Sequence, residues 1–280
     1  MDKADDNRVR AALEAIGQLP DPEIAIADAA LQLARADLPD ADPEAARAHL
    51  SVLAREAVEL AGTVTPDDVI GQAVGLARLL GEAHGYVGNT SSYDDLANAN
   101  LIQVIERRRG LPVALGVLWL HCARAAGWGC HGVDFPGHFL LALSHQGTQL
   151  VLDVFNGGAP MDAPALRRLI KAVEGPQAEL RPGILRPIGT RAVLLRLQNN
   201  IKLRRLQAGD MEGALACTEN MLRIAPDEAS QWRDAVLMHQ RLGQLSDALR
   251  CGEAFLRLVP QGEAAERMRA AMADLRARLN

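Results

Sequence analysis

The chain has 280 residues and a mass of 30.1 kDa, more than one hydrophobic core usually holds, so two or three packed units are expected. Hydrophobic residues make up 49% of it and charged residues 23%, a composition that excludes an intrinsically disordered protein. The net charge of −5 and the aromatic content of 3% disfavour nucleic-acid binding, which needs a basic surface or rings that stack on bases.

Residues 1–87 are predicted to form an N-terminal helical unit that packs on the rest of the chain. Three residue pairs each place a capping side chain before a proline suited to a first helical turn: Asp21-Pro22, Asp42-Pro43 and Thr65-Pro66. Apolar residues recur at helical spacing at Leu50, Leu53, Ala57 and Leu60. Seven basic and sixteen acidic residues give this segment a balance of −9, so a broad solvated face is expected.

Residues 88–187 are predicted to form a core that combines a buried helix with a small antiparallel sheet. A helix over residues 101–109 ends in three arginines, 107–109, which either bind an acidic group or are exposed charges at a helix end. Residues 113–126 are apolar on almost every side, which indicates a central helix buried all round. Three β-like runs follow, at residues 131–135, 138–144 and 149–155.

His138 and Asp153 are predicted to be neighbours across a hairpin. If Gln146-Gly147 is a two-residue turn, His145 pairs with Thr148, and the same register sets Asp153 beside the start of the preceding strand. Side chains two residues apart share a face of a sheet, so His138 and Asp153 become diagonal neighbours. A turn one residue longer would put them on opposite faces. An Asp that orients a His is half of a nucleophilic triad.

Residues 188–280 contain an internal repeat with a period of 34 residues. Seven residues recur at this offset: Gly209, Ala214, Leu215, Cys217, Leu222, Arg223 and Pro226 return as Gly243, Ala248, Leu249, Cys251, Leu256, Arg257 and Pro260. The pattern resembles the tetratricopeptide repeat, and Trp232 stands where that repeat favours Trp. Residues 263–280 are predicted to form a closing helix, because each helix pair needs a neighbour to bury its apolar face.

Three strings of the middle segment resemble the SirB1 family, which joins a transglutaminase-like core to C-terminal tetratricopeptide-like repeats. They are ERRRGLP at 106–112, VDFPGHFL at 133–140 and LDVFNGG at 152–158. The resemblance covers roughly residues 40–262, on the evidence of these strings and the repeat period. It implies a predominantly helical α+β fold: a transglutaminase-like, cysteine-protease-like core with a small antiparallel sheet at residues 88–187, and about two repeats plus a closing helix at residues 188–280.

The resemblance also implies a Cys-His-Asp triad, and here the chain departs from it. Active transglutaminase-like enzymes carry a Cys at the start of the central helix, where the helix N-terminus and the His favour the thiolate. Pro112 stands at that place, and its neighbours Leu111, Val113 and Ala114 carry no nucleophile. The candidate catalytic residues are therefore reduced to His138 and Asp153.

Two interpretations of His138 and Asp153 follow. We favour a protein that lost the thiol nucleophile and acts through protein–protein interaction. For His138 itself two roles stay open, since the pair with Asp153 either holds the sheet together or supplies a general base. The alternative is a hydrolase or acyl-transfer enzyme in which Asp153 orients His138 as a general base. Cys130 could substitute as a nucleophile, but it stands at the wrong place for this architecture, and a structural role is commoner. Asp134 is expected to line a cleft beside His138.

A protein or peptide partner is expected at residues 188–280, where the repeats would supply a concave surface. The chain is expected to be cytoplasmic, because residues 1–6 lack the apolar segment of a signal peptide and no apolar run is long enough to span a membrane. No cofactor is expected, and no metal site, because the His and Cys residues lack a recognised ligand spacing. The partner, any substrate and the oligomeric state remain open.

Overall fold

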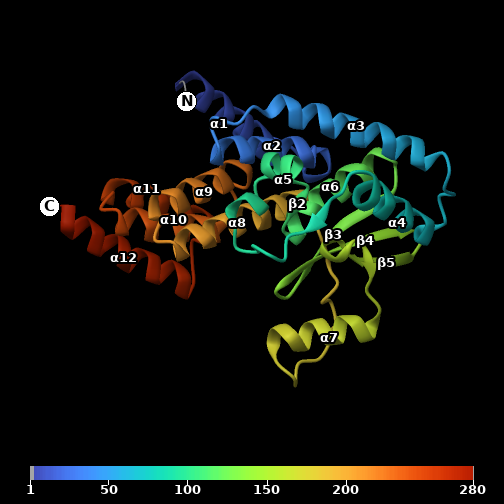
Figure 1. The fold of residues 1–280 in the computed structure, drawn as a ribbon. Helices are drawn as coiled ribbons and strands as arrows, with labels where there is room; N and C mark the ends of the chain where they lie inside the picture. The colour runs from blue at the N-terminus through green and yellow to red at the C-terminus, as the bar shows by residue number, and fades with distance from the viewer. Residues whose placement is uncertain (1–2, 280) are drawn as a thin grey trace. The chain divides into compact units, whose positions relative to one another are not determined.

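The computed structural model describes residues 3–279, and the described elements group into two compact units (Figure 1). The core unit consists of residues 20–197, and the repeat unit combines the residues before 20 with those from 198 onward. The segment 1–87 is thus divided, because its first helix, α1 (Lys3–Gln18), belongs to the repeat unit. The domain boundaries that the sequence predicts after residues 87 and 187 stay predictions. Residues 1 and 2, part of the acidic N-terminal stretch, lie outside the described residues.

The core unit is α+β, as the resemblance implied. Its helices are α2 (Ile26–Asp37), α3 (Pro43–Ala61), α4 (Val69–Ala77), α5 (Leu101–Arg107), α6 (Pro112–Ala125), α7 (Ala163–Glu174) and the first half of α8 (Thr190–Gln207). The π-helical segment Arg78–Ala83 continues α4, and β1 (Val87–Gly88) pairs in parallel with β2 (Arg109–Gly110). Helix α5 ends at Arg107, two residues before the expected end, because Arg108 adopts a positive φ of 57°.

Within the described residues, five antiparallel strands form one sheet in the order β6-β5-β4-β3-β7. They are β3 (Gly129–Phe135), β4 (His138–His145), β5 (Thr148–Asp153), β6 (Ala159–Pro160) and β7 (Pro187–Ile188). The three expected β runs are therefore confirmed as β3, β4 and β5. The third run ends at Asp153 rather than at residue 155, because Asp153 caps the 3₁₀ turn Val154–Asn156.

The β4–β5 hairpin has the expected two-residue turn. His145 lies opposite Thr148, and Leu141 lies opposite Leu152, which confirms the register. Gln146 and Gly147 have φ values of 45° and 88°, and two positive φ values are typical of the type I′ turn that suits a twisted hairpin. Asp153, the next residue of β5, therefore lies beside the start of β4.

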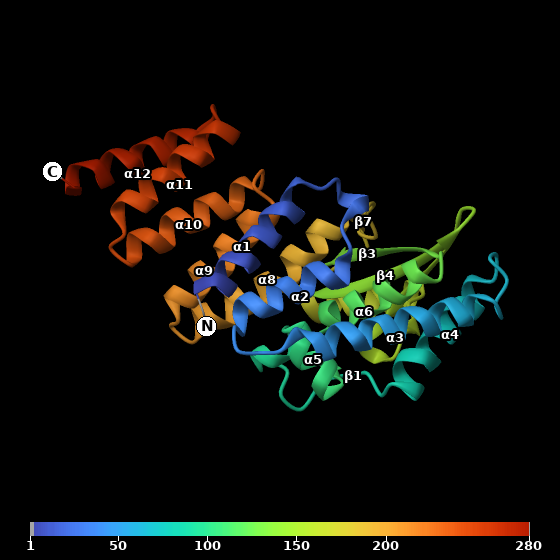
Figure 2. The same ribbon diagram turned by 90° about the horizontal axis from the view of Figure 1, so that it is seen from above.

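Helices cover both faces of the sheet. A Cβ added at Gly116 of α6 would overlap the ring of Phe139, so α6 packs directly on the face to which Phe139 points. Leu166 and Ile170 of α7 belong to the opposite hydrophobic cluster, with the sheet residues Val133, Phe135, Leu140, Ala142 and Val151. Figure 1 shows α6 and α7 on opposite sides of the strands, and Figure 2 shows α2 and α3 beside α6. As expected, α6 is buried all round, since its apolar side chains meet helices as well as the sheet.

The three pairs of a capping residue and a proline have different roles in the structure. Asp42 caps α3 as expected, and its carboxylate accepts the backbone N–H of Glu44 at 2.9 Å. Thr65-Pro66 does not begin a helix, because α4 starts at Val69 with Asp68 as its cap. The carboxylate of Asp21 instead accepts the backbone N–H groups of Thr190 and Arg191, both at 2.8 Å, and so caps α8 at a distance of 169 residues in the chain.

Replacing Asp21 with alanine is expected to destabilise the core unit by about 1–2 kcal/mol, because two N–H groups at the start of α8 lose their acceptor and the helix dipole loses a negative charge. Urea denaturation measures the difference. Asp42→Ala serves as the matched control, since it removes a cap that is local in the sequence and is expected to cost about 1 kcal/mol. Equal denaturation midpoints for Asp21→Ala and the wild type would contradict this role.

The repeat unit consists of helices alone among the residues described. The second half of α8 is followed by α9 (Met211–Ile224), α10 (Ala229–Arg241), α11 (Leu245–Leu258) and the expected closing helix, α12 (Glu263–Leu279). The repeated residues have equivalent roles: Gly209 and Gly243 have φ values of 78° and 74° in their turns, and Ala214 and Ala248 are fully buried.

Helix α1 joins this array by packing on α9. A Cβ added at Gly17 would overlap the carbonyl oxygen of Arg223, and Leu13 of the same helix is completely buried. Glycine at position 17 therefore permits two helix backbones to approach closely. The N-terminal helix covers one side of α9, the role that a neighbouring repeat has in a longer array.

Candidate functional site

His138 and Asp153 are brought together as the hairpin register requires. His138 opens β4, Asp153 ends β5, and the distance from His138 Nε2 to Asp153 Oδ1 is 3.0 Å. The side chains are 15% and 6% exposed, so the pair is largely buried but part of the His138 side chain reaches solvent. This geometry fits a His held in one orientation by a carboxylate.

The carboxylate of Asp153 has further partners beside His138. Its Oδ1 accepts the backbone N–H groups of Phe155 at 3.0 Å and Asn156 at 3.4 Å, and its Oδ2 accepts the side-chain amide of Asn156 at 2.7 Å. Burial by itself raises the pKa of Asp153, but the bonds from His138, Asn156 and Phe155 outweigh burial and lower that pKa below its usual value. Asn156 is not among the predicted site residues, although it belongs to the string Asn156-Gly157-Gly158, which forms a turn with positive φ at both glycines.

The alternation of β4 decides which face of the sheet carries the pair. His138 lies directly opposite Phe135, and directly opposite residues point to the same face. Phe135 belongs to the cluster that packs on α7, whereas Phe139, the neighbour of His138, points to α6. The side chain of His138 therefore projects from the α7 face of the sheet. This face is opposite to the one that packs on α6, the helix whose first turn carries the thiol in active transglutaminase-like enzymes.

The first turn of α6 is buried and contains no nucleophilic side chain. Leu111 is the N-cap residue and Pro112 is the first helical residue, and both are buried, as are Val113 and Ala114. Cys122 lies deep in α6, and burial raises the pKa of its thiol to about 12. Cys130 lies in β3, where burial likewise raises the pKa of the thiol, against a smaller opposite effect of Arg124. Neither thiol has the environment of an activated nucleophile.

Asp134 does not share a face with His138, which corrects the expectation that it lines the same cleft. Asp134 lies opposite Phe139 and forms an ion pair with Arg196 of α8. The Arg196 guanidinium also lies 5.9 Å from the centre of the Phe139 ring and donates to the carbonyl oxygen of Phe135 at 3.4 Å. Asp134 thus fastens α8 to the sheet.

A second polar cluster, which no motif of the sequence indicates, joins α3 to the residues that precede β1 and β2. His84 Nε2 lies 2.5 Å from Glu56 Oε2, and the rings of His49 and His84 meet edge to face with centroids 5.2 Å apart. Arg108 donates to His49 and to the hydroxyl of Tyr86, and its guanidinium stacks 4.9 Å from the Tyr86 ring centre. Arg107 forms an ion pair with Asp95 at 3.0 Å, so two of the three arginines considered for an acidic ligand are engaged within the protein.

This cluster predicts a pH dependence of stability. Burial, with the positive charges of Arg108 and His84, lowers the pKa of His49 to about 4, against an opposite effect of Glu56. The unfolded chain binds a proton at His49 near pH 6.5, so between pH 6.5 and pH 4 it holds more protons than the folded chain, and acidification favours unfolding. The wild type is expected to lose about 1–2 kcal/mol more than His49→Gln between pH 7 and pH 4.5, measured by urea denaturation. Parallel pH profiles of the two proteins would contradict this.

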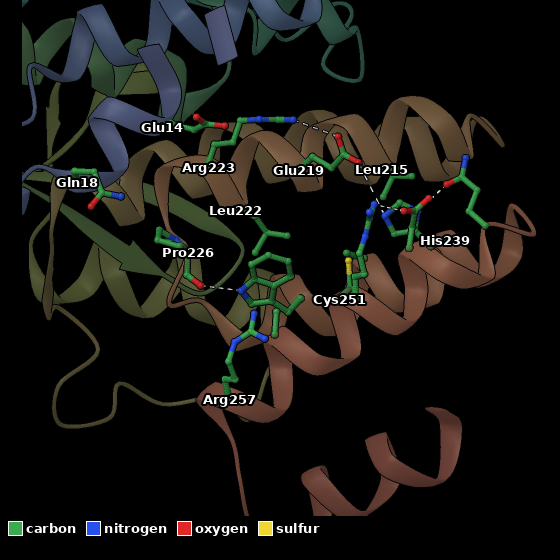
Figure 3. Close-up of a pocket in the computed structure, with 16 residues that line it drawn as sticks. Glu14, Gln18, Leu215, Glu219, Leu222, Arg223, Pro226, His239, Cys251 and Arg257 are labelled. Atoms are coloured by element: carbon green, nitrogen blue, oxygen red, sulfur yellow. Dashed lines mark hydrogen bonds and ion pairs between the residues drawn. The ribbon is translucent and has the colours of Figure 1, made fainter. Parts of the chain in front are cut away.

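The repeat unit contains a cavity of about 740 Å³ between its helices (Figure 3). Its lining residues come from α1 (Glu14, Gln18), α9 and the following turn (Leu215, Glu219, Leu222, Arg223, Pro226), α10 (Trp232, Ala235, His239), the turn before α11 (Gln244) and α11 (Asp247, Arg250, Cys251, Ala254, Arg257). We call it the α9–α11 groove. It is lined mainly by the second helices of the two repeats, and α8 does not contribute to it.

No helix among the described residues has the length and apolar character that crossing a membrane requires. No group of three or more His, Cys, Asp or Glu side chains within residues 3–279 is arranged to hold a metal ion.

Comparison with known proteins gives matches along most of the chain. A family model described as the transglutaminase-like superfamily matches residues 44–199, and a tetratricopeptide repeat model matches residues 201–273. A UPF0162 protein of Xylella fastidiosa (strain 9a5c) is 33% identical over 201 residues, which are 71% of this chain and 72% of that protein. One of Vibrio cholerae is 32% identical over 218 residues, 78% of this chain and 80% of that protein. F-box only protein 21 of Homo sapiens is 35% identical over 71 residues, 11% of its length.

Proposed function

Because the chain belongs to the transglutaminase-like superfamily and continues into tetratricopeptide repeats, we propose that it is a SirB1-type member without a thiol nucleophile, which acts by binding a protein partner through residues 188–280. The observation that carries the proposal is the start of α6, where the first helical residue is the buried Pro112 and the resemblance to the SirB1 family implies a Cys in active enzymes. Proline has no group that could attack a carbonyl, so the usual acyl-enzyme intermediate cannot form at this position.

The geometry of His138 and Asp153 supports the same function. The pair lies on the α7 face of the sheet. The Asp153 carboxylate accepts four hydrogen bonds, and the two from backbone N–H groups fix the turn Val154–Asn156. A carboxylate with this set of partners has a structural task that needs no substrate. Binding of a partner is supported by the repeats, since helix pairs of this kind commonly present extended binding surfaces.

The missing nucleophile is tested by thiol labelling of the folded chain. Iodoacetamide at pH 7 is expected to alkylate each of the four cysteines at least ten times more slowly than it alkylates the thiol of free glutathione. The reason is that Cys122, Cys217 and Cys251 are buried and that burial raises the thiol pKa of Cys122, Cys130 and Cys251. The unfolded chain in urea provides the control, in which all four should react. A cysteine that reacts faster than glutathione in the folded chain would overturn the first half of the proposal.

The binding half of the proposal is tested by capture with the full chain, followed by cross-linking. A dihydrazide reagent that joins carboxylates is suitable, because residues 188–280 carry eleven acidic residues but one lysine. Cross-links from the captured partner are expected to fall within residues 188–280. Cross-links confined to residues 20–187 would contradict the proposal.

His138→Asn, used as a second bait, separates the proposal from its alternative. The alternative is a hydrolase or acyl-transfer enzyme with His138 as general base, and the partial exposure of the His138 side chain favours it. In that case the protein captured by the wild type would be a substrate. Under our proposal His138→Asn captures the same partner as the wild type. A hydrolysed or acylated product that forms with the wild type and disappears with folded His138→Asn would support the enzyme instead.

A further inference from the structure

The α9–α11 groove has an apolar floor between charged rims. Leu215, Leu222, Ala235 and Ala254 are buried side chains that line it, and Trp232 forms part of its wall. The indole N–H of Trp232 donates to the carbonyl oxygen of Pro226 at 2.7 Å, which fixes the ring. An apolar floor, a fixed aromatic ring and a volume of about 740 Å³ suit a few side chains of a bound segment.

Most charges on the rim are compensated within the protein. Arg223 lies 3.5 Å from Glu219 and donates to Asn220, and Arg250 forms an ion pair with Asp247. His239 lies 2.6 Å from Gln244 and 4.0 Å from Glu219. These groups therefore have little reason to attract a free anion, and the three arginines of the groove are balanced by three carboxylates.

Two charges on the rim differ from the rest. Arg257 of α11 and Glu14 of α1 are exposed, and neither side chain forms a hydrogen bond or an ion pair with another residue in the part of the chain that the structure describes. In Figure 3, Leu222 lies between Glu14 and Arg257. The groove thus presents a carboxylate and a guanidinium that belong to no ion pair, with an apolar middle between them.

We infer that the α9–α11 groove binds a short peptide segment of a partner protein that presents a basic side chain to Glu14, an apolar side chain to Leu222 and Trp232, and a carboxylate to Arg257. The inference rests on the proposed function, since it names the part of the repeat unit that holds the partner. A phosphate or an anionic lipid surface fits less well, because the rim has no net positive charge. The two charges set the direction of the segment, and the apolar middle contributes most of the affinity.

Peptide selection on the full chain tests this inference. A random dodecapeptide library on phage is selected against the immobilised wild type, and the dissociation constants of the enriched peptides are measured by fluorescence polarisation. Enriched peptides are expected to carry an apolar residue between a basic and an acidic one. Arg257→Glu is expected to weaken their binding about tenfold, and changing the peptide's acidic residue to lysine should restore binding to this variant.

Arg241→Glu is the matched control, because Arg241 is an exposed arginine of α10 that does not line the groove. It should bind the selected peptides like the wild type. Both substitutions lie on the surface, so they are expected to leave the melting temperature unchanged. Glu14→Lys provides the second arm, with an expected preference for peptides whose basic residue is replaced by an acidic one.

Three outcomes would overturn the inference. Peptides that bind Arg257→Glu and the wild type equally would place the site elsewhere, and groove variants that only change the sedimentation coefficient would make a second copy of the chain the occupant. If no peptide is enriched but the captured partner cross-links to residues 188–280, the groove is not the site and the proposed function still holds. If the partner cross-links only to the core unit, the proposed function itself fails.

Discussion

Asp153→Ala is expected to destabilise the core unit by about 3–5 kcal/mol, because a buried carboxylate is removed from a network of hydrogen bonds. His138 and the turn Val154–Asn156 would then keep four donor groups without their acceptor. Urea denaturation at pH 7 measures the free energy of unfolding. Asp162→Ala is the control, because Asp162 also caps an element, α7, but does so on the exposed surface and should cost about 1 kcal/mol.

His138→Ala tells whether the pair has a structural or a catalytic task. If it is structural, the variant loses about 1–3 kcal/mol, less than Asp153→Ala, because Asp153 keeps the bonds from Phe155 and Asn156. If it is catalytic, a measurable activity disappears while the unfolding free energy stays at the wild-type value. A loss below about 0.5 kcal/mol in both variants would refute the structural role.

Gly116→Val is expected to destabilise the core unit by about 3 kcal/mol or more. The Cβ would overlap the ring of Phe139, which is 1% exposed and cannot move aside, and overpacking of this kind forces the backbone of α6 away from the sheet. Thermal and urea denaturation of the purified variant provide the measurement. Gly81→Ala is the control, since a Cβ there meets no atom within 4 Å and should be neutral or slightly stabilising.

A double variant checks the mechanism of this loss. Phe139→Leu removes the ring that the new side chain would meet, so Gly116→Ala combined with Phe139→Leu should lose less stability than the sum of the single variants. Strict additivity would show that Gly116 is needed for a reason other than contact with Phe139.

The fold class was predictable because it depends on local patterns. The 34-residue repeat, the apolar residues of α6 and the turn at Gln146-Gly147 are properties of neighbouring residues, and the structure confirms each. The distance between His138 and Asp153 followed from the same turn, since a hairpin register is set by the length of its loop. The position of Pro112 at the start of the central helix could also be predicted from the sequence.

Contacts between distant segments were not predictable from these patterns. Asp21 looks like the cap of the turn that begins beside it, but its acceptor oxygens meet N–H groups 169 residues later. His49, Glu56, His84, Tyr86 and Arg108 come from three segments, and no spacing in the sequence indicates that they meet. Asn156 could have been found, because an Asp followed three residues later by a polar side chain is typical of a capped turn.

The sequence by itself therefore determined the helices, the hairpin, the repeats and the lack of a thiol at the start of α6. Tertiary structure decided that His138 and Asp153 start from the α7 face, that α1 belongs with the repeats, and that α1, α9, α10 and α11 together line a groove. The physical reason is that periodicity tells which side of an element is buried, whereas the partner that buries it depends on how the whole chain packs.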